Sequence, residues 1–389
     1  MYWRPPTSAL DVVQKSVLED MERYDGKFYW LKGFAGTGKT VLLLEYLERY
    51  LRIHPNAIVT YVSFTYALRD LVATGVKKEF GDRILFLLGS QIHDSGFIFD
   101  IAVVDEVQDI RAEDLLKISR VSKKVIFAGD FDQQIFKGGI SSRTLINQFN
   151  PKIGSLAGVY RLTKKLITLA KIAYPQSNIE EAECKIPLKS GSDVYVKCAN
   201  GWSEEVQWVW NKAKEVSVNN YPSLILLPRH KLIYQFFSEI ARLHGFSLES
   251  QSRDYESINS EFESKGVPLR YYGNGIGDLK ESDLSPRVYV MTYHSAKGLD
   301  FSWVFIPFIN DRLEIAWPDL RESIENVDLK LLYVALTRSS YNLYLSYSGT
   351  PYSAIQAALS AGVIKEITSS SASQASQSEE DEEDDDDFF

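Results

Sequence analysis

The sequence has few cysteines and no long apolar run. Its 389 residues include two cysteines, Cys184 and Cys198, and their number and spacing exclude a disulfide framework or a cysteine-based zinc site. We expect both thiols to be buried or inert. No apolar stretch reaches the roughly 20 residues of a membrane-spanning helix, and the first residues lack the basic and then apolar order of a signal peptide. The sequence therefore predicts a cytoplasmic protein.

Basic residues are not in excess either. The formal net charge is −9, but residues 379–387 are nine consecutive acids, and without them the 52 acidic residues fall to 43, the number of lysines and arginines. The body of the chain is therefore neutral, and its composition gives no general nucleic-acid-binding signal, although it leaves room for a local basic groove. With 45% hydrophobic and 24% charged residues, the chain is typical of a globular protein.

A glycine-rich segment carries the strongest motif. Residues 33–40 (GFAGTGKT) fit the phosphate-binding pattern G-x-x-x-x-G-K-[ST], between a strand expected at 28–31 and a helix expected at 41–51. The pattern predicts a nucleotide site in which Lys39 reaches the outer phosphates and Thr40 places its hydroxyl on Mg²⁺. The alternative is a glycine-rich turn without a ligand. The candidate nucleotide-binding residues here are Gly33, Ala35, Gly36, Thr37, Gly38, Lys39 and Thr40.

Two acids follow an apolar run at 99–104. Such a run reads as a buried parallel strand that delivers carboxylates to its C-terminal edge, where open α/β sheets bind ligands. We expect Asp105 to hold Mg²⁺ together with Thr40, and Glu106 to accept a proton from the attacking water. Taken alone, the pair could also be solvated acids at a strand end; the phosphate-binding motif favours the catalytic interpretation.

Two further strands end in polar loops. Residues 57–64 read as a strand that runs into a helix start at 65–70, and residues 124–128 read as a strand that ends at 129–134. In the second loop, Gln133 is a candidate for the polar group that detects the terminal phosphate. Before the phosphate loop, residues 8–21 have the spacing of a helix with Leu10, Val13, Val17 and Leu18 on a buried face.

The pattern of strands and helices restarts after Tyr160, where a helix is expected to begin. Strands are expected at 194–196, 223–227 and 288–291, with helices at 204–216 and 230–243 between them. We therefore predict an α/β protein with an ATP-binding domain at 1–150, a second domain at 151–365 and a tail at 366–389. Arg338 closes an apolar helix expected at 331–338, as a C-terminal cap or as a contact to phosphate; we favour the phosphate.

Seven ordered blocks between about residue 10 and residue 338 resemble the superfamily 1 helicases of the UvrD/Rep type. Their order, spacing and strand context agree together, and the acidic block fits that family's D-E-x-Q-D form. The blocks are Leu10 with Gln14, residues 33–40, 63–65, 105–109, 129–133, Tyr160 with Arg161, and residues 292–300 followed by Arg338.

The resemblance implies a P-loop NTPase of two RecA-like domains, each a largely parallel sheet flanked by helices. It implies ATP and Mg²⁺ as cofactors, Gln14 on the adenine base and Asp300 near the ribose. Arg161 and Arg338 would contact the terminal phosphate from the second domain, so that hydrolysis follows closure of the cleft. The residues expected to contact single-stranded DNA are Ser63, Phe64, Thr65, Phe136, Thr292 and His294.

Two departures from the family pattern bear on activity. Residues 135–139 lack the tryptophan that UvrD-like members place after the coupling glutamine, although Phe136 could stack on a base. The intervals from Lys39 to Asp105 and from Arg161 to Thr292 leave no room for large helical insertions. The chain thus resembles a compact two-lobed motor, expected to be a monomer, with ATPase activity and strand translocation better supported than processive unwinding.

The tail combines nine acids with a terminal Phe388-Phe389. We expect it to be disordered because it cannot bury enough apolar surface. A solubilising role would explain the acids, but the two aromatic residues resemble the tails of bacterial and phage single-strand binding proteins. The tail is expected to recruit a polymerase or similar replication partner, or to compete with DNA. It also suggests a phage or mobile-element source.

Three functions follow from these features. The first is an ATP-dependent DNA helicase or translocase, leaning towards 3′-to-5′ movement by resemblance. The second is a DNA-stimulated ATPase that remodels or recruits replication and repair proteins without processive unwinding. The third is an interaction protein that uses ATP as a conformational switch.

Overall fold

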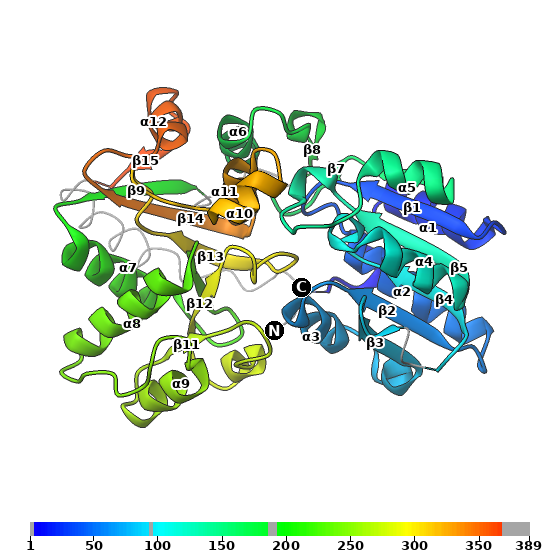
Figure 1. The fold of residues 1–389 in the computed structure, drawn as a ribbon, viewed down its shortest axis with the longest axis horizontal. Coiled ribbons are helices and arrows are strands. Elements are labelled where there is room, and N and C mark those ends of the chain that lie inside the picture. The colour runs from blue at the N-terminus through cyan, green and yellow to red at the C-terminus, as the bar shows by residue number, and fades with distance from the viewer. Residues whose placement is uncertain (1–3, 93–95, 186–192, 368–389) are drawn as a thin grey trace, which may run out of the picture.

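A computed structural model describes residues 4–92, 96–185 and 193–367. The described chain forms two lobes that lie side by side, each a parallel sheet covered by helices (Figure 1). Of the tail predicted at 366–389, residues 368–389, with their expected disorder and partner, lie outside the described residues, whereas Glu366 is the last residue of a strand. Within them, no helix combines the length and the apolar character needed to cross a bilayer.

The first lobe contains a six-stranded sheet in the order β3-β2-β4-β5-β1-β6, in which every neighbouring pair is parallel. Its strands are β1 (Phe28–Gly33), β2 (Val59–Ser63), β3 (Ile84–Leu88), β4 (Phe99–Val104), β5 (Ser122–Gly129) and β6 (Lys152–Leu156). Its helices are α1 (Val12–Arg23), α2 (Lys39–Ile53), α3 (Tyr66–Thr74), α4 (Ala112–Arg120) and α5 (Ser142–Phe149), with short 3-10 turns η1 (Thr7–Ala9), η2 (Lys78–Arg83), η4 (Val107–Asp109) and η5 (Phe131–Gln133).

The second lobe contains a seven-stranded parallel sheet in the order β11-β12-β10-β13-β14-β9-β15. Its strands are β9 (Val194–Ala199), β10 (Ser223–Leu227), β11 (Leu269–Tyr271), β12 (Val288–Thr292), β13 (Phe301–Ile306), β14 (Ser339–Ser348) and β15 (Lys365–Glu366). Its helices are α6 (Lys164–Ala173), α7 (Trp202–Val216), α8 (His230–Leu243), α9 (Tyr255–Ser264), α10 (Pro318–Ser323), α11 (Val327–Leu336) and α12 (Ser353–Ser360), with η6 (Ile179–Glu181) and η7 (Leu279–Asp283). The link between the lobes contains the strand pair β7 (Gly158–Val159) and β8 (Glu183–Cys184).

The strands form where the sequence is apolar on both faces, as buried parallel strands require. All five residues of β2, β10 and β12 are buried. Because neighbouring strands are parallel, the loops that follow them meet at one edge of each sheet. In the first lobe this edge carries the loops after β1, β2, β4 and β5, which hold most of the predicted site residues.

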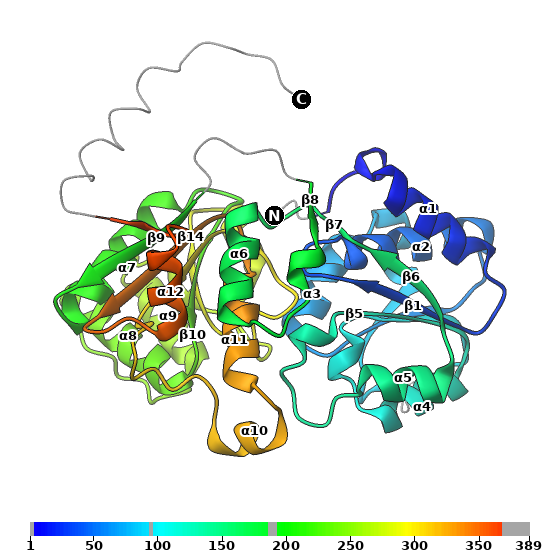
Figure 2. The same ribbon diagram turned by 90° about the horizontal axis from the view of Figure 1, so that it is seen from above.

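The two lobes share a hydrophobic core. Helices α6 and α11 pack against each other on the face of the second sheet that is turned towards the first lobe (Figure 2). The core built on them also includes Ala35, Ala67, Leu71 and Ile135 from the first lobe. Apolar burial at the interface thus holds the two strand edges close to each other.

The α/β class and the two parallel sheets are confirmed, but several local expectations are wrong. The first sheet continues to Leu156 through β6, past the boundary predicted at 150. No helix begins at Tyr160; α6 starts at Lys164, because Thr163 caps it by accepting a hydrogen bond from the backbone N–H of Leu166. Val13 is 49% exposed, because α1 begins at Val12 with its buried face on Gln14, Leu18 and Met21.

The cysteines also differ from expectation. Cys198 is exposed although it lies two residues after the buried Val196 and therefore on the same face of β9, close to the end of the strand. Cys184 is half-buried at the short strand β8. Neither thiol is a core residue.

Candidate functional site

A cavity of about 400 Å³ lies between the two lobes. Residues from the phosphate loop, α1 and the loops after β4 and β5 line it on the first lobe. Residues from the loops after β7, β12 and α11 line it on the second. It brings together these predicted site residues: Gln14, Ala35, Gly36, Gly38, Lys39, Thr40, Glu106, Gln133, Arg161, Asp300 and Arg338.

The phosphate loop has the backbone that its glycines predict. Gly36 and Gly38 have φ angles of 76° and 85°, in the left-handed region that disfavours side chains. A Cβ atom on Gly36 would also lie 2.8 Å from Cβ of Arg161 on the other lobe, so that glycine is required by space as well. Lys39 is buried, and its ammonium donates to the carbonyls of Gly33 and Phe34, each at 2.9 Å.

Two residues of the phosphate loop, Gly33 and Thr37, do not line the cavity. The hydroxyl of Thr37 donates to the Phe34 carbonyl at 2.9 Å, which closes the loop on itself. A Cβ atom on Gly33 would lie 2.6 Å from the same hydroxyl, so glycine at 33 permits this closure. Both residues therefore shape the loop.

Gln14 is 6% exposed and is held between α1 and the phosphate loop. Its side-chain oxygen accepts from the backbone N–H of Asp11 at 3.1 Å, and its amide nitrogen donates to the Thr37 carbonyl at 3.1 Å. Gln14 is therefore buried and not solvated on the surface of α1. The side chain lines the cavity, and its contact with an adenine base stays a prediction.

Asp105 and Thr40 form an oxygen cluster behind the loop. The hydroxyl of Thr40 donates to Oδ2 of Asp105 at 2.6 Å, and the hydroxyl of Tyr61 donates to the same oxygen at 2.5 Å. Burial raises the pKa of Asp105 and, with the Asp105 charge beside it, raises the pKa of Tyr61 well above its usual value. Tyr61 is therefore a neutral donor to this carboxylate.

The donor set fits Mg²⁺. This ion prefers hard oxygen ligands and usually keeps waters and phosphate oxygens beside one or two protein groups, and Thr40 with Asp105 supplies such a pair. In the described parts of the chain, no group of three or more His, Cys, Asp or Glu side chains is arranged to hold a metal. A closed protein cage is thus not the kind of site found here.

Glu106 lies in the left-handed region with φ of 54°, at the turn that follows β4. Its carboxylate accepts from the side-chain amide of Gln108 at 2.5 Å and lies 3.7 Å from the ammonium of Lys297. Burial alone would raise the pKa of Glu106, but the nearby charges of Lys297, Lys39 and Arg338 outweigh it and lower that pKa. The carboxylate is therefore ionised at neutral pH and able to accept a proton.

Lys297 was not predicted from the sequence as a site residue. It comes from the loop after β12, and its buried ammonium crosses to the first lobe to contact the Asp109 carboxylate and the Gln133 carbonyl. Burial raises the pKa of Asp109 to about 6, while the Lys297 charge opposes that rise. The position of Lys297 inside the block 292–300 is the signal that could have identified it.

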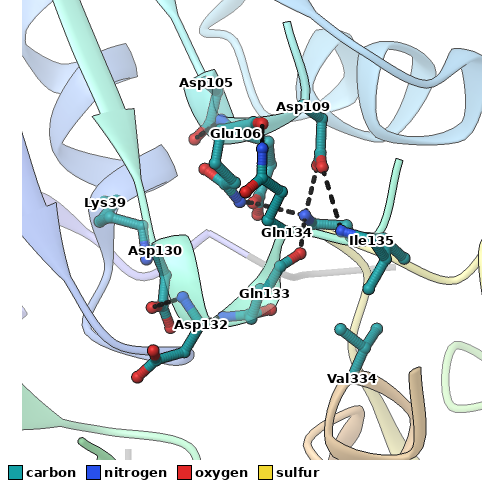
Figure 3. A network of polar contacts seen from close by, with 12 residues as sticks. Lys39, Asp105, Glu106, Asp109, Asp130, Asp132, Gln133, Gln134, Ile135 and Val334 are labelled. Atoms are coloured by element: carbon teal, nitrogen blue, oxygen red, sulfur yellow. Dashed lines mark hydrogen bonds and ion pairs between the residues drawn. The ribbon is translucent and has the colours of Figure 1, made fainter. Parts of the chain in front are cut away.

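Gln133 and Arg338 form a second contact between the lobes. Gln133 donates to Asp130 at 2.9 Å, and its side-chain oxygen accepts from Arg338 at 3.0 Å. Figure 3 shows Gln133 between the turn that carries Glu106 and the helix that carries Val334. Burial and the neighbouring Arg161 lower the pKa of Arg338 to about 9, so it stays charged at neutral pH.

Arg338 caps its helix, which is one of the two roles that the sequence left open, and its contact to phosphate stays a prediction. Helix α11 ends at Leu336, and the Arg338 Nε donates to the Val334 carbonyl at 2.8 Å, which caps the helix. The other side of the guanidinium faces Gln133, and the residue lines the cavity. The helix predicted at 331–338 thus ends two residues earlier than expected.

Arg161 and Asp300 lie on the second-lobe side of the cavity. Their charged groups are 3.8 Å apart, between Nη1 and Oδ1. The Nε of Arg161 is buried without a hydrogen-bond partner within the described residues. A buried guanidinium nitrogen without a partner fits an anionic ligand in this cavity.

The predicted nucleic-acid residues are brought together only in part. The ring of Phe136 lies 4.3 Å from that of Phe64 and 5.6 Å from that of His294, between centroids, so these three side chains form one aromatic cluster across the lobes. The polar candidates have local partners instead. Ser63 donates to the Thr65 carbonyl, Thr65 caps α3, and Thr292 donates to Ser295.

The fold and the cavity define a class: a two-lobed α/β protein with a P-loop nucleotide site between parallel sheets. Comparison with known families agrees with the motifs. Residues 247–350 match the UvrD-like helicase C-terminal domain. The resemblance of the chain to the superfamily 1 helicases of the UvrD/Rep type, drawn from its motifs, is thus confirmed.

Individual relatives are similar over part of their length. The chain is 27% identical over 168 residues to the ATP-dependent DNA helicase PcrA of Staphylococcus aureus (strain Mu50 / ATCC 700699), which covers 36% of this chain and 22% of the relative. It is 29% identical over 143 residues to PcrA of Staphylococcus epidermidis (strain ATCC 12228 / FDA PCI 1200), which covers 31% and 19%. Among solved structures, the arterivirus nonstructural protein 10 helicase with DNA aligns over 86% of this chain and 62% of that chain, with a TM-score of 0.44 and 16% identity.

The contact of Lys297 with Asp109 predicts a large effect on stability. Lys297→Met leaves Asp109 buried without its cation, so we expect the free energy of unfolding to fall by about 3–5 kcal/mol in urea denaturation. Lys123→Met removes the solvent-exposed pair with Asp100 and should leave the free energy of unfolding nearly unchanged. A Lys297→Met protein whose free energy of unfolding is within about 1 kcal/mol of wild type, as for the loss of a surface ion pair, would contradict the assigned contact.

His294 predicts a pH dependence. Burial and the nearby charge of Lys297 lower its pKa from 6.5 to about 4, so between these values the unfolded chain binds a proton that the folded chain does not. Its contribution to stability is present above about pH 6.5 and is lost as the pH falls towards 4, by about 2 kcal/mol after allowance for partial exposure. In His294→Phe, the fall in the free energy of unfolding between pH 6.5 and pH 4 should be smaller than in wild type by about 2 kcal/mol. If the free energy of unfolding depends on pH in the same way in both proteins, the lowered pKa of His294 is refuted.

Proposed function

We propose that this protein is an ATP-dependent DNA helicase or translocase that moves on single-stranded DNA, with 3′-to-5′ polarity. One observation carries the proposal: Lys39 and Glu106 from the first lobe line a single cavity with Arg161 and Arg338 from the second. A catalytic site divided between two lobes changes its activity when the lobes move relative to each other. Hydrolysis coupled to such movement is what a motor requires.

The residues have distinct parts in hydrolysis. Lys39 and the loop N–H groups bind the outer phosphates, and Glu106 accepts the proton of the attacking water. Arg161 and Arg338 stabilise the charge that spreads over the phosphoryl oxygens. Thr40 and Asp105 would hold Mg²⁺, which when bound neutralises phosphate charge. Gln133, in contact with Arg338, connects the cavity to the second lobe.

Two observations support single-stranded DNA as the nucleic acid that the protein binds. The relatives named above are DNA helicases by name. The aromatic cluster of Phe64, Phe136 and His294 lies across the lobes at the same strand edges as the cavity, and aromatic side chains are the usual stacking platforms for single-stranded nucleic acid. Movement of the lobes would therefore change this cluster together with the cavity.

A second candidate is a DNA-stimulated ATPase that remodels or recruits replication and repair proteins without processive unwinding. Between β2 and β4 the described residues contain only α3, η2 and β3, so nothing in them adds a further domain. The chain spans 22% of the length of the first relative it matches.

We also propose a division into an ATP-binding lobe ending after β6, a second lobe to residue 365, and a tail from 366. The tail would recruit a replication partner, and the protein would act as a monomer.

The test is ATP hydrolysis with and without single-stranded DNA. We expect DNA to stimulate the wild type strongly, and Lys39→Ala to lower kcat by at least about 100-fold because it removes a charge that stabilises the transition state. Lys32→Ala, which removes an exposed lysine of β1 just before the loop, is the matched control and should behave as wild type.

Each result has a separate meaning. Hydrolysis that is indifferent to DNA would overturn the helicase and the DNA-stimulated ATPase together. Hydrolysis that persists in Lys39→Ala would show that the cavity is not the nucleotide site. If stimulation is found, a strand-separation assay on partial duplexes with either overhang distinguishes the two candidates and gives the polarity.

A further inference from the structure

Tyr61 is a fully buried residue of β2 that no sequence motif includes. Its hydroxyl lies within hydrogen-bond distance of the Asp105 carboxylate, 2.5 Å from Oδ2. Thr40 donates to the same oxygen at 2.6 Å, and the backbone N–H of Glu106 donates to Oδ1 at 2.9 Å. Three donors therefore surround one carboxylate.

These three hydrogen bonds determine which oxygen of Asp105 can still bind a cation. A carboxylate oxygen has two lone-pair positions for hydrogen bonds or metal ions. The hydroxyls of Thr40 and Tyr61 occupy both positions on Oδ2, whereas the N–H of Glu106 occupies one position on Oδ1. One lone pair of Oδ1 is thus left for a cation or a water bound to it.

We propose that Tyr61 is a positioning residue for the divalent cation of the nucleotide site, because its hydroxyl fixes the Asp105 carboxylate in the orientation that binds the ion. The inference rests on the proposed function. Without Tyr61, Thr40 would be the only side chain among the described residues that donates to this carboxylate, and the carboxylate could rotate about its last bond. Partners that orient a metal ligand are worth about 10–100-fold in metal affinity or activity.

Tyr61 is itself held rigidly. Strand β2 lies between β3 and β4, and Tyr61 is opposite Phe86 on one side and Val103 on the other. Its ring packs on that of Phe86, with centroids 5.7 Å apart. Because β2 has a neighbouring strand on each side, the phenol of Tyr61 has little freedom to move. Its hydroxyl therefore holds the Asp105 carboxylate at a fixed position relative to the sheet.

The same sheet contains a second buried tyrosine that serves as a control for a purely structural role of Tyr61. Tyr29 of β1 is equally buried, and its hydroxyl donates to a carboxylate as well, that of Asp20 at 2.9 Å. Asp20 lies on α1, and its hydrogen-bond partners Tyr29 and Lys152 do not line the cavity, whereas Asp105 accepts from Thr40, which does. Tyr29→Phe therefore removes the same kind of bond from the same sheet without touching the site.

The test measures metal binding directly. Wild type, Tyr61→Phe and Tyr29→Phe are each mixed with the non-hydrolysable ATP analogue AMP-PNP and titrated with MnCl₂, and the free Mn²⁺ is followed by electron paramagnetic resonance. We expect Tyr61→Phe to weaken Mn²⁺ binding by about tenfold or more, and Tyr29→Phe to bind Mn²⁺ as wild type does. Binding of AMP-PNP without metal is measured on the same samples.

The metal-free measurement separates positioning from folding. A folding defect in Tyr61→Phe lowers the fraction of protein that binds AMP-PNP, whereas loss of positioning lowers only the affinity for Mn²⁺. Equal Mn²⁺ affinity in Tyr61→Phe and wild type, or equal weakening in Tyr29→Phe, would overturn the inference alone. A wild type that binds no Mn²⁺ with AMP-PNP would overturn the proposed function and the inference with it.

Discussion

The buried contact of Lys297 with Asp109 is the interaction on which the arrangement of the two lobes depends. Transfer of an ammonium group from water to a protein interior costs several kcal/mol, as an order of magnitude, unless a carboxylate and hydrogen bonds replace the water. Among the described residues, the partners of the Lys297 ammonium all lie on the first lobe: Asp109, the Gln133 carbonyl and Glu106. These contacts hold the loop after β12 against the first lobe, next to the cavity.

The charges around the cavity are divided between the lobes by sign. The first lobe supplies Asp105, Glu106, Asp109 and Asp130, balanced in part by Lys39, and all five are buried. The second lobe supplies the cations Lys297, Arg338 and Arg161, balanced in part by Asp300. Because each lobe holds charges that the other must neutralise, approach of the lobes is favourable, and an added phosphate group would alter that balance. This is the physical reason to regard the interface as the moving part.

Local patterns predicted the elements that depend on local rules. The phosphate loop, β4 with its two acids, and β10 agree with the sequence because a glycine turn and an apolar strand are determined by adjacent residues. The sequence did not single out β3, β13 and β14 as strands, and these lie in both sheets. Their apolar runs could be assigned to a sheet only once the neighbouring strands were known.

Contacts between distant residues could not be predicted. Lys297 meets Asp109 across 188 residues, and Tyr61 meets Asp105 across 44. Nothing in the spacing of a buried strand such as β2 distinguishes a tyrosine that fills the core from one that donates to a ligand. Gln14 illustrates the same limit, because its burial comes from the phosphate loop that packs on α1.

The central claim is that side chains from both lobes complete one hydrolytic site. The most direct measurement is kcat for ATP together with the affinity for a fluorescent ATP analogue, in wild type and Arg338→Lys. Lysine keeps the charge but cannot contact Val334 and Gln133 together. The account predicts that kcat falls by about 100-fold or more while the affinity changes by less than about threefold. An unchanged kcat would contradict it.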